Sequence, residues 1–168
     1  MYRETYADLV RFLHRKVWDA DQAQDLAQET FVRALDHDPE NPRAFVFTIA
    51  ANLARDEARA AIRKKKHLTL MAGGAAEAAG ASAGGGAAEA AEEQDRADVV
   101  RRALEQLSER DREVLLLWDA GFDYGEIARQ TGLSPGAIGT TLARARRKLV
   151  EAYQAVVPEA ERPQKKQV

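Results

Sequence analysis

Two groups of polar and cationic side chains recur at helical spacing in this sequence. The members of the first group are Thr48, Asn52, Arg55, Arg59 and Arg63, and the run Lys64–Lys66 follows directly. Steps of three and four residues place the group on one face of a helix. Clustered cations attract phosphate, and an asparagine amide can pair with the edge of a base. This face therefore predicts contact with nucleic acid.

The second group lies on the outer face of a helix predicted from about residue 135. Its members are Thr140, Arg144 and Arg147. The preceding sequence predicts a shorter helix, which Asp123 caps with Glu126 as its capping-box partner, and which Gly132 ends. Ser134 is expected to cap the second helix, with Pro135 in its first turn. This arrangement predicts a helix-turn-helix for the DNA major groove, although an ordinary helical hairpin with a basic surface gives the same local pattern.

Two further groups have alternative interpretations. Asp25, Gln28 and Glu29 lie on one side of a predicted helix, either as a partner surface or as a solvated face. Phe45 is expected in the core. Phe47 could stack on unpaired bases or pack in the core, and we include it in the expected DNA surface.

Composition argues against several functional classes. The chain has 168 residues, a net charge of -2 and no cysteine, so disulfides and thiolate metal sites are excluded. His14, His37 and His67 do not have metal-ligand spacing, and no phosphate-binding glycine loop is present. We therefore expect no enzymatic activity, no cofactor and no metal. Without an apolar run of membrane-spanning length or a signal peptide, a cytoplasmic location is expected.

The hydrophobic pattern predicts an all-α chain with two small helical domains. Residues 1–67 form the first, and Phe45, Val46, Ile49, Leu53 and Ile62 are predicted to face inward in its third helix. Residues 68–95 are rich in Ala, Gly and acidic residues, which predicts a flexible linker. Residues 96–157 form the second domain, and residues 158–168 are expected to be a mobile tail.

Three motifs in this order resemble an extracytoplasmic-function sigma factor, a small member of the RNA polymerase sigma family. The segments DLAQETFVRAL (Asp25–Leu35) and FVFTIAANLARDEAR (Phe45–Arg59) are similar to sigma region 2, and the stretch Leu107–Leu149 is similar to region 4. The resemblance covers nearly everything outside the linker and the tail. It implies an alternative sigma factor that binds core RNA polymerase, recognises promoter elements and promotes DNA melting.

The resemblance also implies roles for individual residues. Asp25, Gln28 and Glu29 would contact the clamp helices of polymerase, and Asn52 would sit in a pocket for a flipped minus-ten base. The rest of the expected minus-ten surface is Phe47, Thr48, Arg55, Arg59, Arg63 and Lys64. The expected minus-thirty-five surface is Ser134, Gly136, Thr140, Arg144 and Arg147, and the second domain would also sit on the polymerase flap. An anti-sigma factor is a further expected partner, and no membrane insertion is expected.

Two other functions fit parts of the sequence. A self-sufficient helix-turn-helix regulator would bind palindromic duplex as a dimer without polymerase, but it gives residues 1–67 no role. A protein adaptor, such as an antagonist of a sigma factor, would have no effect on DNA in the presence of polymerase.

Overall fold

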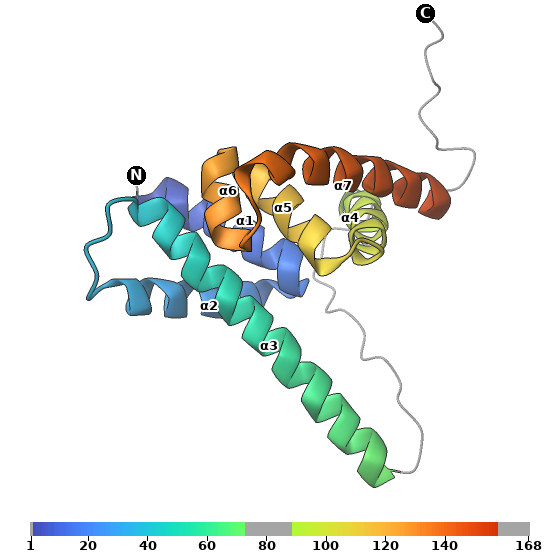
Figure 1. Ribbon diagram of the computed structural model, residues 1–168. Coiled ribbons are helices and arrows are strands. Elements are labelled where there is room, and N and C mark those ends of the chain that lie inside the picture. Colours follow the sequence, from blue (N-terminus) through green and yellow to red (C-terminus); the bar gives the residue numbers. More distant parts are fainter. Residues whose placement is uncertain (1, 73–88, 158–168) are drawn as a thin grey trace, which may run out of the picture. The chain divides into compact units, whose positions relative to one another are not determined.

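The computed structural model describes residues 2–72 and 89–157, and every regular element in these two stretches is an α-helix (Figure 1). The chain divides into two compact units, Met1–Ala83 and Gly84–Val168. The predicted all-α class with two helical domains is therefore confirmed.

The first unit is a bundle in which each helix contacts the other two. Its helices are α1 (Tyr2–Val17), α2 (Ala20–Ala34) and α3 (Pro42–Ala72). Asp19 caps α2, since its carboxylate accepts the Gln22 N–H at 2.8 Å. Asn41 caps α3 in the same way, accepting the Ala44 N–H at 3.0 Å.

Leucine, alanine, valine and aromatic side chains fill the core of this bundle. The buried apolar residues are Leu9, Phe12, Leu13, Ala23, Leu26, Ala27, Val46, Phe47, Ala50, Ala51 and Ala54. Five of these residues are alanines of α2 and α3. An ion pair between Arg43 and Asp8, at 3.2 Å, also links α3 to α1.

The helices extend into the predicted linker from both sides. α3 continues to Ala72, beyond the expected boundary at residue 67, and α4 begins at Glu89 rather than at residue 96. The predicted boundaries lie where large apolar residues become rare. A helix can continue past such a point, because it needs only residues of good helix propensity. Ile62 was expected in the core but is 67 % exposed, because it lies in the stretch of α3 from Asp56 to His67 in which every side chain is exposed. The rest of the predicted linker, residues 73–88, and the predicted tail, residues 158–168, lie outside the described residues.

The second unit packs three helices against a long last one. Its helices are α4 (Glu89–Glu105), α5 (Glu109–Asp119), α6 (Tyr124–Thr131) and α7 (Pro135–Val156). α7 contacts each of the other three, and α5 also contacts α6. The buried apolar residues are Ala103, Leu104, Leu107, Val114, Leu116, Leu117, Phe122, Ile127, Ala128, Ile138, Leu142, Ala145, Ala152 and Val157. α7 therefore carries much of the core on its inner face, and its outer face is left to solvent.

Candidate nucleic-acid interface

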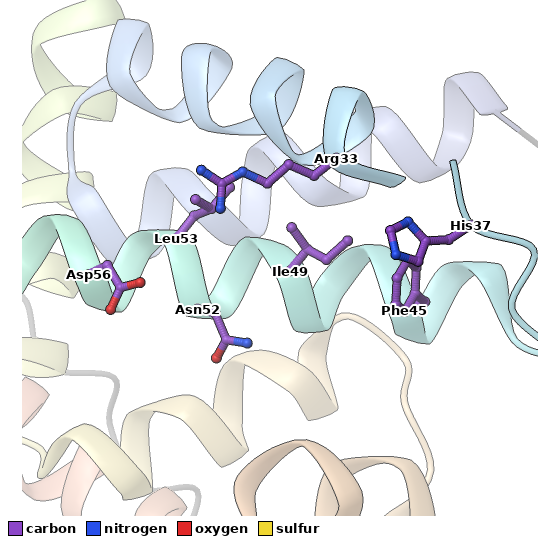
Figure 2. A pocket seen from close by; sticks show the side chains of 7 residues that line it. All are labelled: Arg33, His37, Phe45, Ile49, Asn52, Leu53 and Asp56. Carbon is purple, nitrogen blue, oxygen red and sulfur yellow. The ribbon is translucent and has the colours of Figure 1, made fainter. Parts of the chain in front are cut away.

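A cavity of about 260 Å³ lies between the end of α2, the following loop and α3 in the first unit (Figure 2). Its lining residues are Arg33, His37, Phe45, Ile49, Asn52, Leu53 and Asp56. The rings of His37 and Phe45 lie 5.1 Å apart at one end. Figure 2 shows Arg33 reaching from α2 over Leu53. The cavity thus combines aromatic and aliphatic walls with polar groups, which suits a flat heteroaromatic ring.

Asn52 is exposed at this cavity, and a neighbouring cation fixes its amide. Arg55 donates to the Asn52 carbonyl oxygen at 3.0 Å. The amide oxygen is thereby engaged, and the amide nitrogen remains as the donor that Asn52 can offer to a ligand. Asp56, one turn further along α3, adds a carboxylate acceptor to the same cavity.

Most of the cations predicted on α3 lie on its exposed part, whereas Arg55 is half-buried. Every side chain from Asp56 to His67 is exposed, including Arg59, Arg63 and Lys64. Arg59 lies 3.9 Å from Asp56, but 64 % of its side chain remains exposed. These cations can attract a phosphate backbone, because an exposed ion pair such as that of Arg59 with Asp56 holds a side chain only weakly.

Phe47 was included in the expected DNA surface, and that assignment is wrong. Its side chain is fully buried, with its ring centroid 5.2 Å from that of Phe12 and the Arg43 guanidinium 5.2 Å away. Phe45, expected in the core, is only half-buried and lines the cavity instead. Thr48 is half-buried, and its hydroxyl donates to the Ala44 carbonyl at 2.8 Å. That hydroxyl donates within the helix, and its oxygen can still accept from a ligand.

The polar residues predicted on α2 are exposed and continue into an apolar edge. Asp25, Gln28 and Glu29 all face solvent. Val32 and Leu35 follow at helical spacing and are 60 % and 78 % exposed. Glu29 is held by Arg33 at 2.7 Å within the helix. A surface that passes from acidic to apolar is typical of a protein interface rather than of a solvated helix face.

Local sequence determines the helix-turn-helix of the second unit as predicted. The Asp123 carboxylate accepts the Glu126 N–H at 2.8 Å, and Glu126 accepts the Asp123 N–H at 2.9 Å. Gly132 has a φ of +71°, which favours glycine at the end of α6. Ser134 precedes Pro135 in extended conformation, although its side chain makes no capping hydrogen bond.

The predicted duplex-facing residues all lie on exposed parts of this motif. Ser134, Gly136, Thr140, Arg144 and Arg147 are exposed. Thr140 donates to the Ala137 carbonyl at 3.0 Å, so its oxygen can still accept from a ligand. A recognition helix contacts base edges mainly from its N-terminal half. In α7 the first turns of this half offer hydroxyl and backbone groups, and the cations follow from Arg144 onward.

Asp111 is the residue of this unit that sequence patterns did not identify as important. Its side chain is 2 % exposed, and its two oxygens accept from Arg144 at 2.7 Å and from Lys148 at 2.9 Å. Burial alone would raise the pKa of Asp111, but hydrogen bonds from Arg144, Lys148 and Ser108 and the charge of Arg144 lower this pKa to about 2. The four-residue spacing of Arg144 and Lys148 places both cations on one side of α7, but this spacing does not indicate which residue of α5 pairs with them.

Within residues 2–72 and 89–157, no group of three or more His, Asp or Glu side chains is arranged to hold a metal ion. Among the same residues, none of the helices combines the length and the apolar character that spanning a membrane would require.

Each of the two units matches a known protein family. Residues 1–65 match the family Sigma-70 region 2, and residues 97–149 match Sigma-70, region 4. The sigma factor YlaC of Bacillus subtilis is 28 % identical over 162 residues, which cover 89 % of this chain and 87 % of that protein. The ECF RNA polymerase sigma factor EcfG of Rhodopseudomonas palustris is 36 % identical over 137 residues, covering 78 % and 71 %.

A solved structure shows the same fold. The sigma factor RpoE from Bartonella quintana, crystallised with the anti-sigma factor NepR, aligns with a TM-score of 0.62 and 26 % identity, covering 89 % of this chain and 92 % of that one. The family matches, the relatives and the fold agree. The chain belongs to the extracytoplasmic-function sigma factors, and it is an alternative sigma factor that acts with RNA polymerase and promoter DNA in transcription initiation.

Proposed function

We propose that the two units of this sigma factor divide promoter recognition between them. The first unit captures one unpaired base of the minus-ten element in the cavity beside Asn52, and the second binds the minus-thirty-five duplex through α7. The observation that carries this proposal is the cavity itself, because it opens on the same helix whose extension carries the exposed cations. Phosphate contacts along α3 would hold the strand while a single base enters.

The polar groups at the cavity indicate what kind of base edge it accepts. Arg55 occupies one acceptor position of the Asn52 oxygen, and the Asn52 nitrogen is the group that we expect to donate to an acceptor on the base. Asp56 supplies an acceptor for an exocyclic amino group, and Phe45 with His37 supplies a surface for stacking. A base that presents an acceptor beside an amino group, as cytosine and adenine do, satisfies both groups.

The division of labour predicts opposite defects for two variants. Asn52→Ala should leave affinity for double-stranded minus-thirty-five DNA unchanged and reduce open-complex formation. Arg144→Ala should weaken duplex affinity by roughly 1–3 kcal/mol and relax base preference, while leaving a pre-melted promoter nearly unaffected. The measurement compares both variants on duplex and on pre-melted templates, each assembled with core polymerase.

Lys64→Ala is the control for a contact without sequence preference. It should weaken binding to matched and mismatched templates alike and flatten the salt dependence. If Asn52→Ala and Arg144→Ala lose the same step, the proposed division is incorrect. Thermal unfolding of each variant separates a DNA effect from misfolding, since Arg144→Ala leaves Asp111 with Lys148 as its cation.

We also propose that the exposed face of α2 binds core polymerase, with Asp25, Gln28 and Glu29 toward the clamp helices. Val32 and Leu35 support this, since exposed apolar side chains beside a polar stripe fit a protein partner. Residues in the second unit would contact the polymerase flap. The chain would perform no catalysis of its own and would act in the cytoplasm.

Leu35→Glu is expected to reduce affinity for core polymerase by about tenfold or more, because it places a charge in the proposed apolar contact. The fold should be preserved, because Leu35 is 78 % exposed. Glu29→Arg should have the same direction of effect. Ile62→Glu is the matched control, since Ile62 is 67 % exposed on α3 in the same unit and lies outside the proposed interface. Co-purification and titration with core enzyme give the affinities. Equal affinity for wild type and Leu35→Glu would contradict this assignment.

An anti-sigma factor is the remaining proposed partner. The similar RpoE structure contains the anti-sigma factor NepR, which supports the same kind of regulation here. Val32 and Leu35, at the end of α2, form a surface that such a partner would cover in competition with polymerase.

A further inference from the structure

Asp111 is a buried carboxylate on α5 whose two cationic partners both come from α7. One oxygen accepts from Arg144 at 2.7 Å, and the other accepts from Lys148 at 2.9 Å. The Asp111 side chain is 2 % exposed, whereas those of Arg144 and Lys148 are 47 % and 45 % exposed. Each cation thus has one end fixed in the protein and much of its surface open to solvent.

Arg144 is the first cation on α7. The segment from Pro135 to Ala143 contains neither Lys nor Arg. A recognition helix contacts base edges mainly from its N-terminal half, so the direction in which this one guanidinium points strongly affects readout. The ion pair with Asp111 uses one N–H of the five donors that a guanidinium carries, and the others can still pair with a base.

We propose that Asp111 is a positioning residue for promoter readout, which holds the Arg144 guanidinium in the orientation that reads the minus-thirty-five duplex. This inference rests on the proposed duplex role of α7. Lys148 contributes by engaging the second oxygen, so that the carboxylate cannot rotate away from Arg144. A preorganised side chain loses less conformational entropy on binding, which raises the selectivity of the contact.

Asp111 also limits non-specific attraction. The carboxylate neutralises part of the charge of two cations on the surface expected to face DNA. Without it, both cations would be free to follow phosphates of any sequence. Asp111 is therefore expected to raise the preference for the correct duplex while lowering affinity for the wrong one.

The experiment measures this preference with the full chain assembled on core polymerase. The probe is a double-stranded library randomised over the upstream element. The sequence most enriched by the wild type is then compared with a scrambled duplex over a series of salt concentrations. Asp111→Asn should lower the ratio of the two affinities by roughly tenfold and steepen the dependence of log affinity on log salt by about 1.

Glu105→Gln is the matched control, because Glu105 is a carboxylate of the same unit that pairs with Arg101 at 3.0 Å on the surface of α4. It should change neither quantity. A purely structural role for Asp111 would reduce affinity for both duplexes equally and would not steepen the salt dependence. That result would overturn the proposal.

A double-mutant cycle tests whether Asp111 acts through Arg144. Arg144→Lys keeps the charge and loses the planar fork of donors, so it should lower the preference by itself. Adding Asp111→Asn to Arg144→Lys should then lower the preference little further. Fully additive losses would show that Asp111 acts by another route.

A measurement on the wild type keeps the proposal testable if Asp111→Asn misfolds. Side-chain NMR of the free protein should show restricted rotation of the Arg144 guanidinium and free rotation of that of Arg147, which is 71 % exposed and lies 3.8 Å from Glu151. Equal mobility would contradict the inference. If the wild type prefers no member of the library, the proposed function is wrong. If the wild type prefers one sequence and Asp111→Asn keeps the same preference, only the positioning role of Asp111 is wrong.

Discussion

Replacement of Phe47 by alanine is expected to destabilise the first unit by about 3–5 kcal/mol, the usual cost of removing a fully buried phenylalanine. The ring is completely buried between Phe12 and the Arg43 guanidinium, so its removal leaves a cavity that these neighbours cannot fill. Much of the stability of a small helical bundle would be lost.

Phe45→Ala is the matched comparison, two residues away on the same helix. Phe45 is only half-buried, so this change should cost ~1 kcal/mol in stability. It should instead reduce open-complex formation, because the ring lines the cavity proposed to hold a base. The two phenylalanines should therefore separate folding from function.

Denaturant unfolding of the full chain can isolate the first unit. The chain has two tryptophans, Trp18 in the first unit and Trp118 in the second. A Trp118→Phe background leaves Trp18 fluorescence to report the first unit alone. Similar losses of stability for Phe45→Ala and Phe47→Ala would contradict the assignment of Phe47 to the core and Phe45 to the cavity.

Acidification is expected to remove roughly 2 kcal/mol of stability from the second unit through Asp111. Its pKa falls from the ordinary 3.8 to about 2 on folding, so the folded state binds this proton less readily than the unfolded state. The stabilisation is complete above pH 3.8 and is lost as the pH falls through about 2. Protonation would leave Arg144 and Lys148 without their anion.

Trp118 fluorescence in a Trp18→Phe background reports this transition. Asp111→Asn should lower stability at neutral pH by a similar amount and remove this part of the acid dependence. Glu105→Gln, which alters a surface ion pair, should preserve the wild-type profile. An unchanged acid dependence in Asp111→Asn would show that other carboxylates cause the loss.

Features determined by neighbouring residues could be predicted from the sequence. The capping box of Asp123 and Glu126 and the left-handed Gly132 both depend on a few consecutive residues. The exposure of Asn52, Arg144 and the α2 triplet followed from helical periodicity, which gives the faces of a helix once its core side is known.

Features determined by tertiary packing could not be predicted in this way. Phe45 and Phe47 lie on different sides of α3, and which side faces inward depends on where α1 lies. Asp111 lies in the first turn of α5, where Ser108 accepts its N–H at 3.2 Å. Its carboxylate instead turns to α7, a choice that depends on how two distant helices pack.

The exposed extension of α3 affects how this protein can evolve. From Asp56 to His67 no side chain is buried, and this stretch of the helix is on the order of 18 Å long. No packing partner restricts the shape of residues there, so helix propensity and charge are the main constraints. Exchanges among Arg, Lys and Ala can accumulate in this segment without endangering the fold. Promoter strength can therefore drift by small steps along this segment, while the core and the cavity beside it stay unchanged.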